Sequence, residues 1–234
     1  MQLGRFRIIS GYASRIVVDT KANVVWRYAF GAGREGIRQN YGWLRKSQGI
    51  VPAPVPILVK RIGPLLATCE EYIPGRRLNA ADITPSAAQD VLRMVVPLYR
   101  EYGLPEERIY KTLIHGDLTF RNILCGTQTL FCIDGDRSTM APPEFDVWLL
   151  VADAEIHKKG SASHKKFLQY LWNSAPSDEL FRVATEALYE CLPDARTNKK
   201  YWGTIWTSFL TRCLAHSVRD CMRRGKSIAF LDEL

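Results

Sequence analysis

The chain has 234 residues, of which 47% are hydrophobic and 24% are charged, and its formal net charge is +8. This composition supports a sizeable core and excludes a generally disordered chain. No apolar run reaches the roughly 18 residues of a membrane-spanning helix, and the first residues, MQLGRFRIIS, lack the apolar segment of a signal peptide. The sequence therefore predicts a cytoplasmic protein and leaves a peripheral membrane contact open.

The excess of basic residues favours an acidic partner, such as a nucleotide, a phosphorylated sugar, nucleic acid or an anionic membrane surface. A basic surface without any such partner explains the charge equally well. The sequence carries no nucleic-acid-binding module, Walker loop or Rossmann fingerprint, so no nucleic-acid partner is expected. The six cysteines lack the spacing of a zinc site, which predicts reduced thiols packed in apolar surroundings.

The first 73 residues predict a β-rich lobe with one helix. Short β-branched or aromatic runs indicate strands at Ile8–Ile9, Arg15–Val18, Val24–Phe30, Ile57–Ile62 and Leu65–Ile73. Ile37, Tyr41 and Leu44 repeat at helical spacing, which predicts a helix over Arg34–Gln48. Pro74-Gly75 marks the predicted boundary between this lobe, residues 1–73, and a larger, mainly helical lobe, residues 74–234.

The larger lobe begins with a predicted helix over Pro85–Tyr102, followed by short apolar strands around a polar loop within residues 113–133. From Glu144 onward, helices alternate with polar connectors. Aromatic residues near the end of the chain suit a sugar face, and basic residues there suit an anionic group; these are Tyr201, Trp202, Trp206, Arg212, Arg219, Arg223, Arg224 and Lys226. The favoured interpretation is a core-facing aromatic stripe with a solvated basic face.

A polar cluster lies between two apolar segments in LIHGDLTFRNIL, residues 113–124. Asp117 and Asn122 are five residues apart, and Asp134 follows twelve residues later, after the apolar run Leu130–Ile133. Phosphoryl transfer needs a group that accepts the hydroxyl proton of the acceptor, and oxygen ligands that hold Mg²⁺ against a triphosphate. Two aspartates and an asparagine supply these groups, whereas each residue alone would more often cap a turn or a helix.

The order H-x-D-x-x-x-x-N followed by I-D-x-D resembles the motifs of the aminoglycoside phosphotransferase and choline kinase group of the protein-kinase-like superfamily. The resemblance implies an α+β, two-lobed kinase-like fold, with a small antiparallel N-terminal sheet and one helix, and it implies ATP and Mg²⁺ as cofactors. It assigns Asp117 as catalytic base, Asn122 and Asp134 as metal ligands and Asp136 as a supporting metal ligand. By the same resemblance, His115 braces the loop.

Asp146, in Asp146-Val147-Trp148, resembles the buried aspartate that anchors the catalytic loop in this superfamily, although an ordinary helix N-cap is compatible with it. Only twelve residues separate Asp134 from Asp146, which leaves no room for a long phosphorylatable segment. A permanently assembled site, as in small-molecule kinases, is therefore expected.

The nucleotide side follows the family pattern less closely. Residues 10–14, SGYAS, lie where kinases carry a phosphate-covering loop, so Ser10, Gly11 and Ser14 are candidate phosphate contacts, with a plain hairpin turn as an equal alternative. Arg27 ends the run VVWR, where the family has a lysine. The best candidate for the acid that pairs with it is Glu35, which is equally well explained as a solvated glutamate in the first helical turn.

The run LLATCEEYIPG, residues 65–75, resembles the hinge strand and the E-x-I-P-G turn of the same group. By this resemblance, the backbone of Glu71 and Ile73 would bind the adenine edge, and Tyr72 and Ile73 would line an apolar slot.

The leading hypothesis is an ATP- and Mg²⁺-dependent kinase that phosphorylates a hydroxyl of a small molecule, a sugar or a glycoconjugate. The basic balance favours an anionic acceptor, such as a lipopolysaccharide core sugar, over a cationic aminoglycoside. A compact protein kinase and a kinase-like binding module without catalysis are the alternatives. The sequence does not determine the acceptor, the position phosphorylated or the oligomeric state.

Overall fold

The computed structural model describes residues 2–3, 6–10, 14–82, 84–104, 109–127, 129–158, 160 and 164–223. The chain divides into two compact units. The first runs to Leu78 and includes His115–Asp117 and Arg121–Ser138; the second comprises Asn79–Ile114, Leu118–Phe120 and the chain from Thr139 onward. The catalytic-loop motif therefore belongs largely to the first unit, and the domain boundary between residues 73 and 74 stays a prediction.

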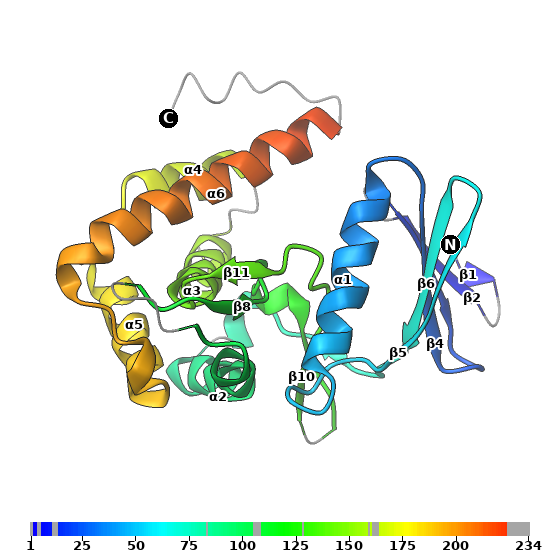
Figure 1. The fold of residues 1–234 in the computed structure, drawn as a ribbon, viewed down its shortest axis with the longest axis horizontal. Coiled ribbons are helices and arrows are strands. Elements are labelled where there is room, and N and C mark those ends of the chain that lie inside the picture. Colours follow the sequence, from blue (N-terminus) through cyan, green and yellow to red (C-terminus); the bar gives the residue numbers. More distant parts are fainter. Residues whose placement is uncertain are drawn as a thin grey trace. The chain divides into compact units, whose positions relative to one another are not determined.

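The elements follow the order expected from the sequence (Figure 1). The strands are β1 (Gln2–Leu3), β2 (Phe6–Ser10), β3 (Arg15–Asp19), β4 (Val24–Ala29), β5 (Pro56–Ile62), β6 (Leu65–Glu71), β7 (Arg76–Arg77), β8 (Thr112–Ile114), β9 (Ile123–Cys125), β10 (Leu130–Cys132) and β11 (Thr139–Ala141). The α-helices are α1 (Gly33–Ser47), α2 (Pro85–Glu101), α3 (Glu144–Lys158), α4 (His164–Trp172), α5 (Glu179–Cys191) and α6 (Trp202–Arg223). Short 3₁₀ turns occupy Ala80–Asp82, Phe120–Asn122, Pro193–Ala195 and Lys199–Tyr201.

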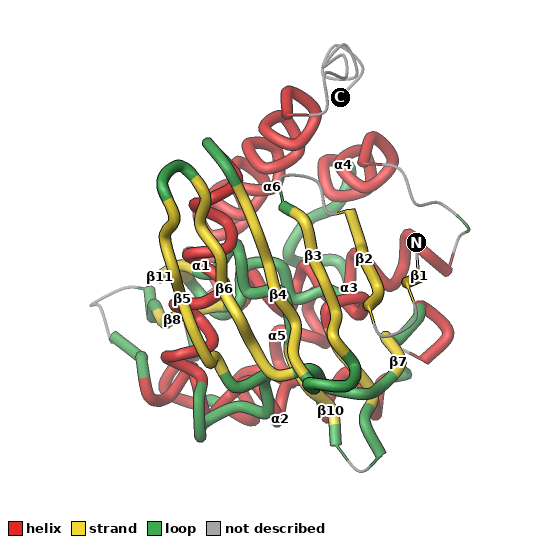
Figure 2. Tube along the Cα trace, turned by 90° about the vertical axis from the view of Figure 1, so that its right-hand side faces the viewer, coloured by secondary structure: helices red, strands yellow, loops and turns green. Residues whose placement is uncertain are grey.

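The first unit is built on an antiparallel sheet in the order β1-β2-β3-β4-β6-β5 (Figure 2). Helix α1 packs on this sheet because Ile37 and Leu44 lie on one helical face, and Ile37 joins Ala29 of β4 and Leu66 of β6 in a buried cluster. The short strands and the helix predicted from periodicity are thus confirmed.

A second, three-stranded sheet, in the order β10-β9-β7, completes the first unit. It explains the glycine of the hinge turn. A Cβ atom at Gly75 would lie 2.7 Å from the carbonyl oxygen of Cys125 in β9, and a backbone atom in a paired strand cannot yield. Glycine at this position therefore lets the chain leave the hinge and pair at once with β9.

The second unit is mainly helical and has an aromatic core. The ring of Trp206 in α6 lies 5.0 Å from Trp148 of α3 and 4.9 Å from Phe181 of α5. Trp202 and Trp206 are 5% and 6% exposed, so the core-facing interpretation is confirmed for these two residues, whereas Tyr201 is half-buried. Of the basic residues predicted beside it, Arg219 is exposed, and Arg224 and Lys226 lie outside the described residues.

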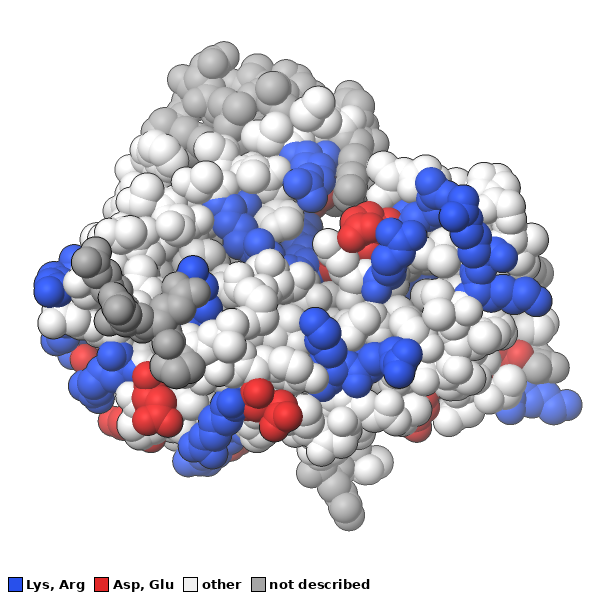
Figure 3. Space-filling model, viewed as in Figure 1, with Lys and Arg blue, Asp and Glu red and all other residues white. Residues whose placement is uncertain are grey.

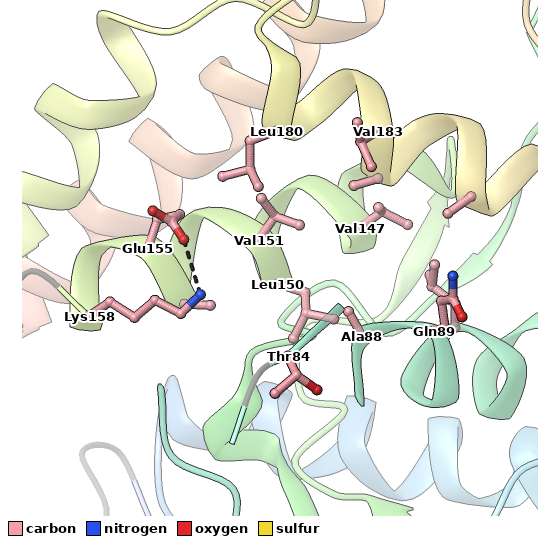
Figure 4. A pocket seen from close by; sticks show the side chains of 14 residues that line it. Thr84, Ala88, Gln89, Val147, Leu150, Val151, Glu155, Lys158, Leu180 and Val183 are labelled. Carbon is pink, nitrogen blue, oxygen red and sulfur yellow. Dashed lines mark hydrogen bonds and ion pairs between the residues drawn. The ribbon is translucent and has the colours of Figure 1, made fainter. Parts of the chain in front are cut away.

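Helices α2, α3 and α5 enclose a mainly apolar cavity of about 180 Å³ (Figure 4). Leu180 and Val183 of α5 face Val151 and Val147 of α3, Leu150 points toward Ala88 of α2, and an ion pair of 3.3 Å joins Lys158 to Glu155 at one end. Such a lining offers few polar groups to a phosphorylated ligand.

The cysteines form no disulfide bonds in this fold. All six cysteines are free thiols, as expected. Within the described ranges, none of the helices combines the length and the apolar character needed to cross a bilayer.

A buried carboxyl lies at the start of α3. Glu144 has no solvent exposure, and its Oε1 accepts a hydrogen bond of 2.7 Å from the hydroxyl of Tyr189. Burial raises the pKa of Glu144 from 4.5 to about 7, although hydrogen bonds to the ionised form, led by that from Tyr189, limit the rise.

This carboxyl predicts a pH dependence of stability. Because the pKa is higher in the folded state, the folded chain binds more protons, and stability is expected to fall as pH rises from about 4.5 to about 7. The loss is on the order of 3 kcal/mol at about 1.4 kcal/mol per pKa unit. Urea unfolding at pH 5 and pH 8 should show a smaller difference for Glu144→Gln than for the wild type or for the exposed control Glu190→Gln. An unchanged difference in Glu144→Gln would contradict this assignment.

Candidate active site

The catalytic-loop motif begins at a buried histidine. His115 is 1% exposed, and its ring lies edge-on to Trp43 of α1 at 4.9 Å. Its Nε2 donates a 2.9 Å hydrogen bond to the carbonyl of Ile133, and its Nδ1 accepts a 3.3 Å bond from the backbone N–H of Asp117. The ring therefore holds the start of the loop against the residue that precedes Asp134, which is a bracing arrangement.

Asp117 and Asn122 contact each other directly. The amide nitrogen of Asn122 donates to the backbone carbonyl of Asp117 at 2.9 Å and to its Oδ2 at 3.0 Å. The carbonyl of Asn122 in turn accepts a 2.9 Å bond from the N–H of Ile133. The other carboxylate oxygen of Asp117, Oδ1, lies 3.5 Å from Nη1 of Arg137. The amide nitrogen of Asn122 is thus engaged by Asp117.

Asp134 follows β10 with an unusual backbone. Its φ of 63° lies in the left-handed region, which aspartate tolerates better than most residues. Its Oδ1 lies 2.6 Å from Nη2 of Arg27, and its Oδ2 lies 3.6 Å from Nη2 of Arg77. Burial acts to raise the pKa of Asp134, but the charges of Arg27 and Arg77 outweigh it and lower the pKa below its usual range. Asp134 is therefore ionised and flanked by two guanidinium groups.

Gly135 separates Asp134 from Asp136 for a steric reason. A Cβ atom at this position would lie 2.5 Å from Cδ2 of Trp43, a fully buried ring. Asp136 itself is exposed, and its Oδ2 lies 3.6 Å from where a Cβ at Gly36 would stand. The close approach of the tryptophan ring fixes the path of the chain between the two aspartates.

Gly135→Ala is therefore expected to destabilise the fold by about 1–3 kcal/mol, the usual cost of overpacking a core. Trp43 cannot move freely because it is 1% exposed and also packs on His115. Gly203→Ala is the matched control, since nothing lies within 4 Å of a Cβ there. Urea unfolding of both variants checks the prediction, and equal stability of the two would refute it.

Arg27 of β4 pairs with a residue that the sequence did not single out. Its Nε and Nη2 donate to Oε1 of Glu70 in β6 at 3.0 and 2.8 Å. Asn40 of α1 donates to the other oxygen of Glu70 at 2.9 Å. Glu35, the acid expected to pair with Arg27, instead forms an exposed ion pair with Arg38 one helical turn away. That pairing prediction was wrong because the partner of Arg27 comes from the adjacent strand.

A cavity of about 730 Å³ opens in the first unit beside this cluster. Its lining includes Arg27, Asp134 and the hinge residues Glu71, Tyr72 and Ile73. The backbone N–H of Glu71 donates to the carbonyl of Val55 at 2.9 Å and is thus engaged within the fold. Two further cations line the cavity, Arg7 and Arg77. The cavity therefore joins an apolar hinge side to a charged side, on which Arg7, Arg27 and Arg77 lie among the carboxylates of Glu70, Glu71 and Asp134.

The predicted phosphate-covering segment is only partly described. Ser10 ends β2 and pairs with Arg15 of the antiparallel strand β3. Ser14 is half-buried, and Gly11 lies outside the described residues. Contacts of Ser10, Gly11 and Ser14 with phosphate stay predictions.

Asp146 lies in the second unit, in the first turn of α3. It has no solvent exposure and accepts a 2.9 Å hydrogen bond from the hydroxyl of Tyr99 in α2. Its anchoring role toward the catalytic loop stays a prediction.

The side-chain oxygens of Asn122, Asp134 and Asp136 are the donor set that the resemblance assigns to Mg²⁺. Over the described part of the chain, no three or more His, Cys, Asp or Glu side chains gather into a metal-binding group. A protein amide and carboxylates nevertheless fit Mg²⁺, which prefers oxygen donors and takes many of its ligands from water and substrate phosphates. The residues present are compatible with this ion.

Three comparisons place these features among known proteins. A family model described as "Phosphotransferase enzyme family" matches residues 59–180. No curated protein matches the sequence.

Several solved structures share the fold. An amicoumacin kinase in complex with AMP-PNP, Ca²⁺ and Ami is 13% identical, with a TM-score of 0.64 over 97% of this chain and 83% of its own. A protein of Ralstonia eutropha described as an aminoglycoside phosphotransferase is 14% identical, with a TM-score of 0.60 over 97% and 87%. An aminoglycoside phosphotransferase of Streptomyces rimosus, in complex with ADP and streptomycin, is 14% identical, with a TM-score of 0.53 over 89% and 92%. At these identities the likeness concerns the fold, and it confirms the predicted α+β, protein-kinase-like architecture.

Proposed function

Because the chain belongs to the phosphotransferase enzyme family, we propose that it is an ATP- and Mg²⁺-dependent kinase that phosphorylates a hydroxyl of a small molecule or sugar. The observation that carries this proposal is the contact of 3.0 Å between Asn122 and Asp117, held in one unit with Asp134 and Arg27 beside a cavity of about 730 Å³. Few other functions need an acid, an amide and a second acid so placed.

Each residue of the loop has a distinct part in the proposed reaction. Asp117 accepts the proton of the acceptor hydroxyl as that oxygen attacks the γ-phosphorus, while the bond from the γ-phosphorus to the bridging oxygen breaks and ADP leaves. Asn122 and Asp134, supported by Asp136, hold Mg²⁺, which neutralises charge on the phosphates when bound. His115 fixes the backbone on both sides of the loop and takes no proton from substrate.

The cavity of the first unit suits the nucleotide. Tyr72 and Ile73 provide an apolar surface for the adenine ring, and the carbonyl of Glu71 can accept a hydrogen bond from it. Arg27 takes the place of the family lysine and offers a planar, bidentate fork to phosphate oxygens. Arg7 and Arg77 line the same cavity and can donate hydrogen bonds to phosphate oxygens.

The acceptor in this proposal carries an anionic group, as in a phosphorylated or acidic sugar of a glycoconjugate. Arg137 lies 3.5 Å from Asp117, where a negative group next to the reacting hydroxyl would find a partner. The chain carries 32 lysine and arginine residues against 24 acidic ones, and basic side chains are spread widely over the face seen in Figure 3. A cationic acceptor would be repelled by such a surface.

An acceptor screen with ATP labelled at the γ-phosphate tests this function. Acidic and neutral sugars, lipopolysaccharide cores, aminoglycosides and a generic protein are compared, with the Asp117→Asn variant as background. Label on an acidic sugar or core is the expected result. Label on protein alone would favour the protein-kinase alternative, and neither transfer nor Mg²⁺-dependent hydrolysis would favour a binding module without catalysis.

A further inference from the structure

Arg27 is shared between two carboxylates. Its Nη2 lies 2.8 Å from Oε1 of Glu70 and 2.6 Å from Oδ1 of Asp134, and its Nε makes a second bond to Glu70. The Arg27 side chain is 11% exposed and that of Glu70 is 4% exposed, so the pair is well shielded from solvent. Interactions between such groups are stronger than those at an open surface.

The sheet register creates this pairing. Glu70 of β6 stands opposite Val25 of β4, and Arg27 follows Val25 by two residues. Alternate residues of a strand point to the same face, so Arg27 and Glu70 are diagonal neighbours on one side of the sheet. The acid is thus built into the strand next to the arginine.

Helix α1 contributes a donor to this cluster. Asn40 is 1% exposed, and its Nδ2 donates to Oε2 of Glu70 at 2.9 Å, whereas its Oδ1 has no hydrogen-bond partner among the described residues. A carboxylate in its place would face Glu70 with like charge. Strand β6 therefore provides Glu70, and helix α1 holds its carboxylate in place through Asn40.

We propose that Glu70 is a positioning residue whose carboxylate balances Arg27 and thereby keeps Asp134 able to bind the divalent metal; this inference rests on the proposed function. Around Asp134, two guanidinium groups, Arg27 and Arg77, are matched by two carboxylates, Glu70 and Asp134. Without the charge of Glu70 the cluster becomes positive, Asp134 is the sole carboxylate partner of Arg27, and a cation approaching Asp134 is repelled.

Binding of Mn²⁺, measured by paramagnetic resonance with and without a non-hydrolysable ATP analogue, tests this inference without any turnover. Glu70→Gln keeps the shape of the side chain and is expected to raise the Kd for Mn²⁺ about tenfold. Adding Asn40→Asp to it returns a negative charge to the cluster and should recover most of that affinity. Glu179→Gln, which removes an exposed carboxylate paired with Arg182 in α5, is the control and should bind Mn²⁺ as the wild type does.

If Glu70→Gln does not fold, Glu70→Asp provides a second test. The shorter side chain keeps the negative charge but moves it away from Arg27, so an intermediate loss of Mn²⁺ affinity is expected. A folded Glu70→Gln or Glu70→Asp variant with wild-type Mn²⁺ affinity overturns the inference and leaves the proposed function standing. A wild-type protein that binds neither Mn²⁺ nor the ATP analogue overturns both.

Discussion

Asp117→Asn is expected to lower the rate of ATP turnover by a factor of about 10² to 10⁴, the usual contribution of general base catalysis. The substituted amide can still accept the hydrogen bond that Asn122 donates at 3.0 Å, so the loop keeps its geometry while losing the group that takes the proton. Release of labelled phosphate from ATP, with and without the best acceptor, measures the effect.

The control for this variant is Asp90→Asn, which removes an exposed aspartate paired with Arg93 on α2. Both variants should retain the far-ultraviolet circular dichroism and the urea midpoint of the wild type. Turnover within threefold of the wild type in Asp117→Asn would contradict the role assigned to this residue.

Arg27→Met is expected to destabilise the first unit by about 3–5 kcal/mol, because it leaves a buried carboxylate without its partner. Glu70 is 3% exposed, and both of its hydrogen bonds from Arg27 are lost together with the ion pair to Asp134. The free energy of unfolding in urea measures the loss. Arg27→Lys keeps the charge, although it offers no planar fork, and should lose less stability.

A second substitution distinguishes the effect of the unpaired charge from the effect of lost packing in the Arg27→Met variant. Because apolar side chains often replace a buried ion pair at little cost, Arg27→Met combined with Glu70→Leu should recover part of the stability lost in Arg27→Met alone. If Arg27→Met alone lowers the free energy of unfolding by less than about 1 kcal/mol, which is the range of exposed ion pairs, the Arg27–Glu70 pair does not behave as a buried ion pair.

The sequence indicated the acidic side of the candidate site because its residues lie close together in the chain. His115, Asp117 and Asn122 lie within eight residues, and Asp134 follows directly after a short strand that the apolar run Leu130–Ile133 had indicated. Residues at such short spacing stay close together in the folded chain, because short strands and a tight loop leave the backbone little conformational freedom. The hydrogen bonds of His115 and Asn122 then tie the two segments together.

The basic side was less accessible to sequence analysis because its partners are far apart in the chain. Glu70 is 43 residues from Arg27, and Asn40 is 30 residues from Glu70, so no local pattern joins them. The sequence nevertheless contained a signal for Glu70 and for Asn40. Glu70 is an acid within a strand that is otherwise buried, and Asn40 is a polar residue on the helical face of Ile37 and Leu44. A buried polar residue in an apolar pattern needs a partner, and here the partners are each other.

The choice of Glu35 as the partner of Arg27 shows where helix-based reasoning fails. Glu35 lies in the first turn of α1, and its carboxylate is 55% exposed beside Arg38. The register between β4 and β6 brings Glu70 to the face that Arg27 occupies, and register is fixed by long-range packing. Arg77 and Arg137 were likewise missed, since each reaches its aspartate only after β7 pairs with β9 or after the turn at Gly135.

Calorimetric titration of an ATP analogue into the wild type and into Asp134→Asn, each with and without Mg²⁺, tests the central claim most directly. Wild-type affinity is expected to rise at least about tenfold when Mg²⁺ is added, a gain of about 1.4 kcal/mol. Asp134→Asn should lose that gain while still binding the nucleotide, because Arg27 and the hinge remain. Nucleotide binding that is absent in the wild type, or that is indifferent to both Mg²⁺ and Asp134, would contradict a metal-dependent phosphotransferase.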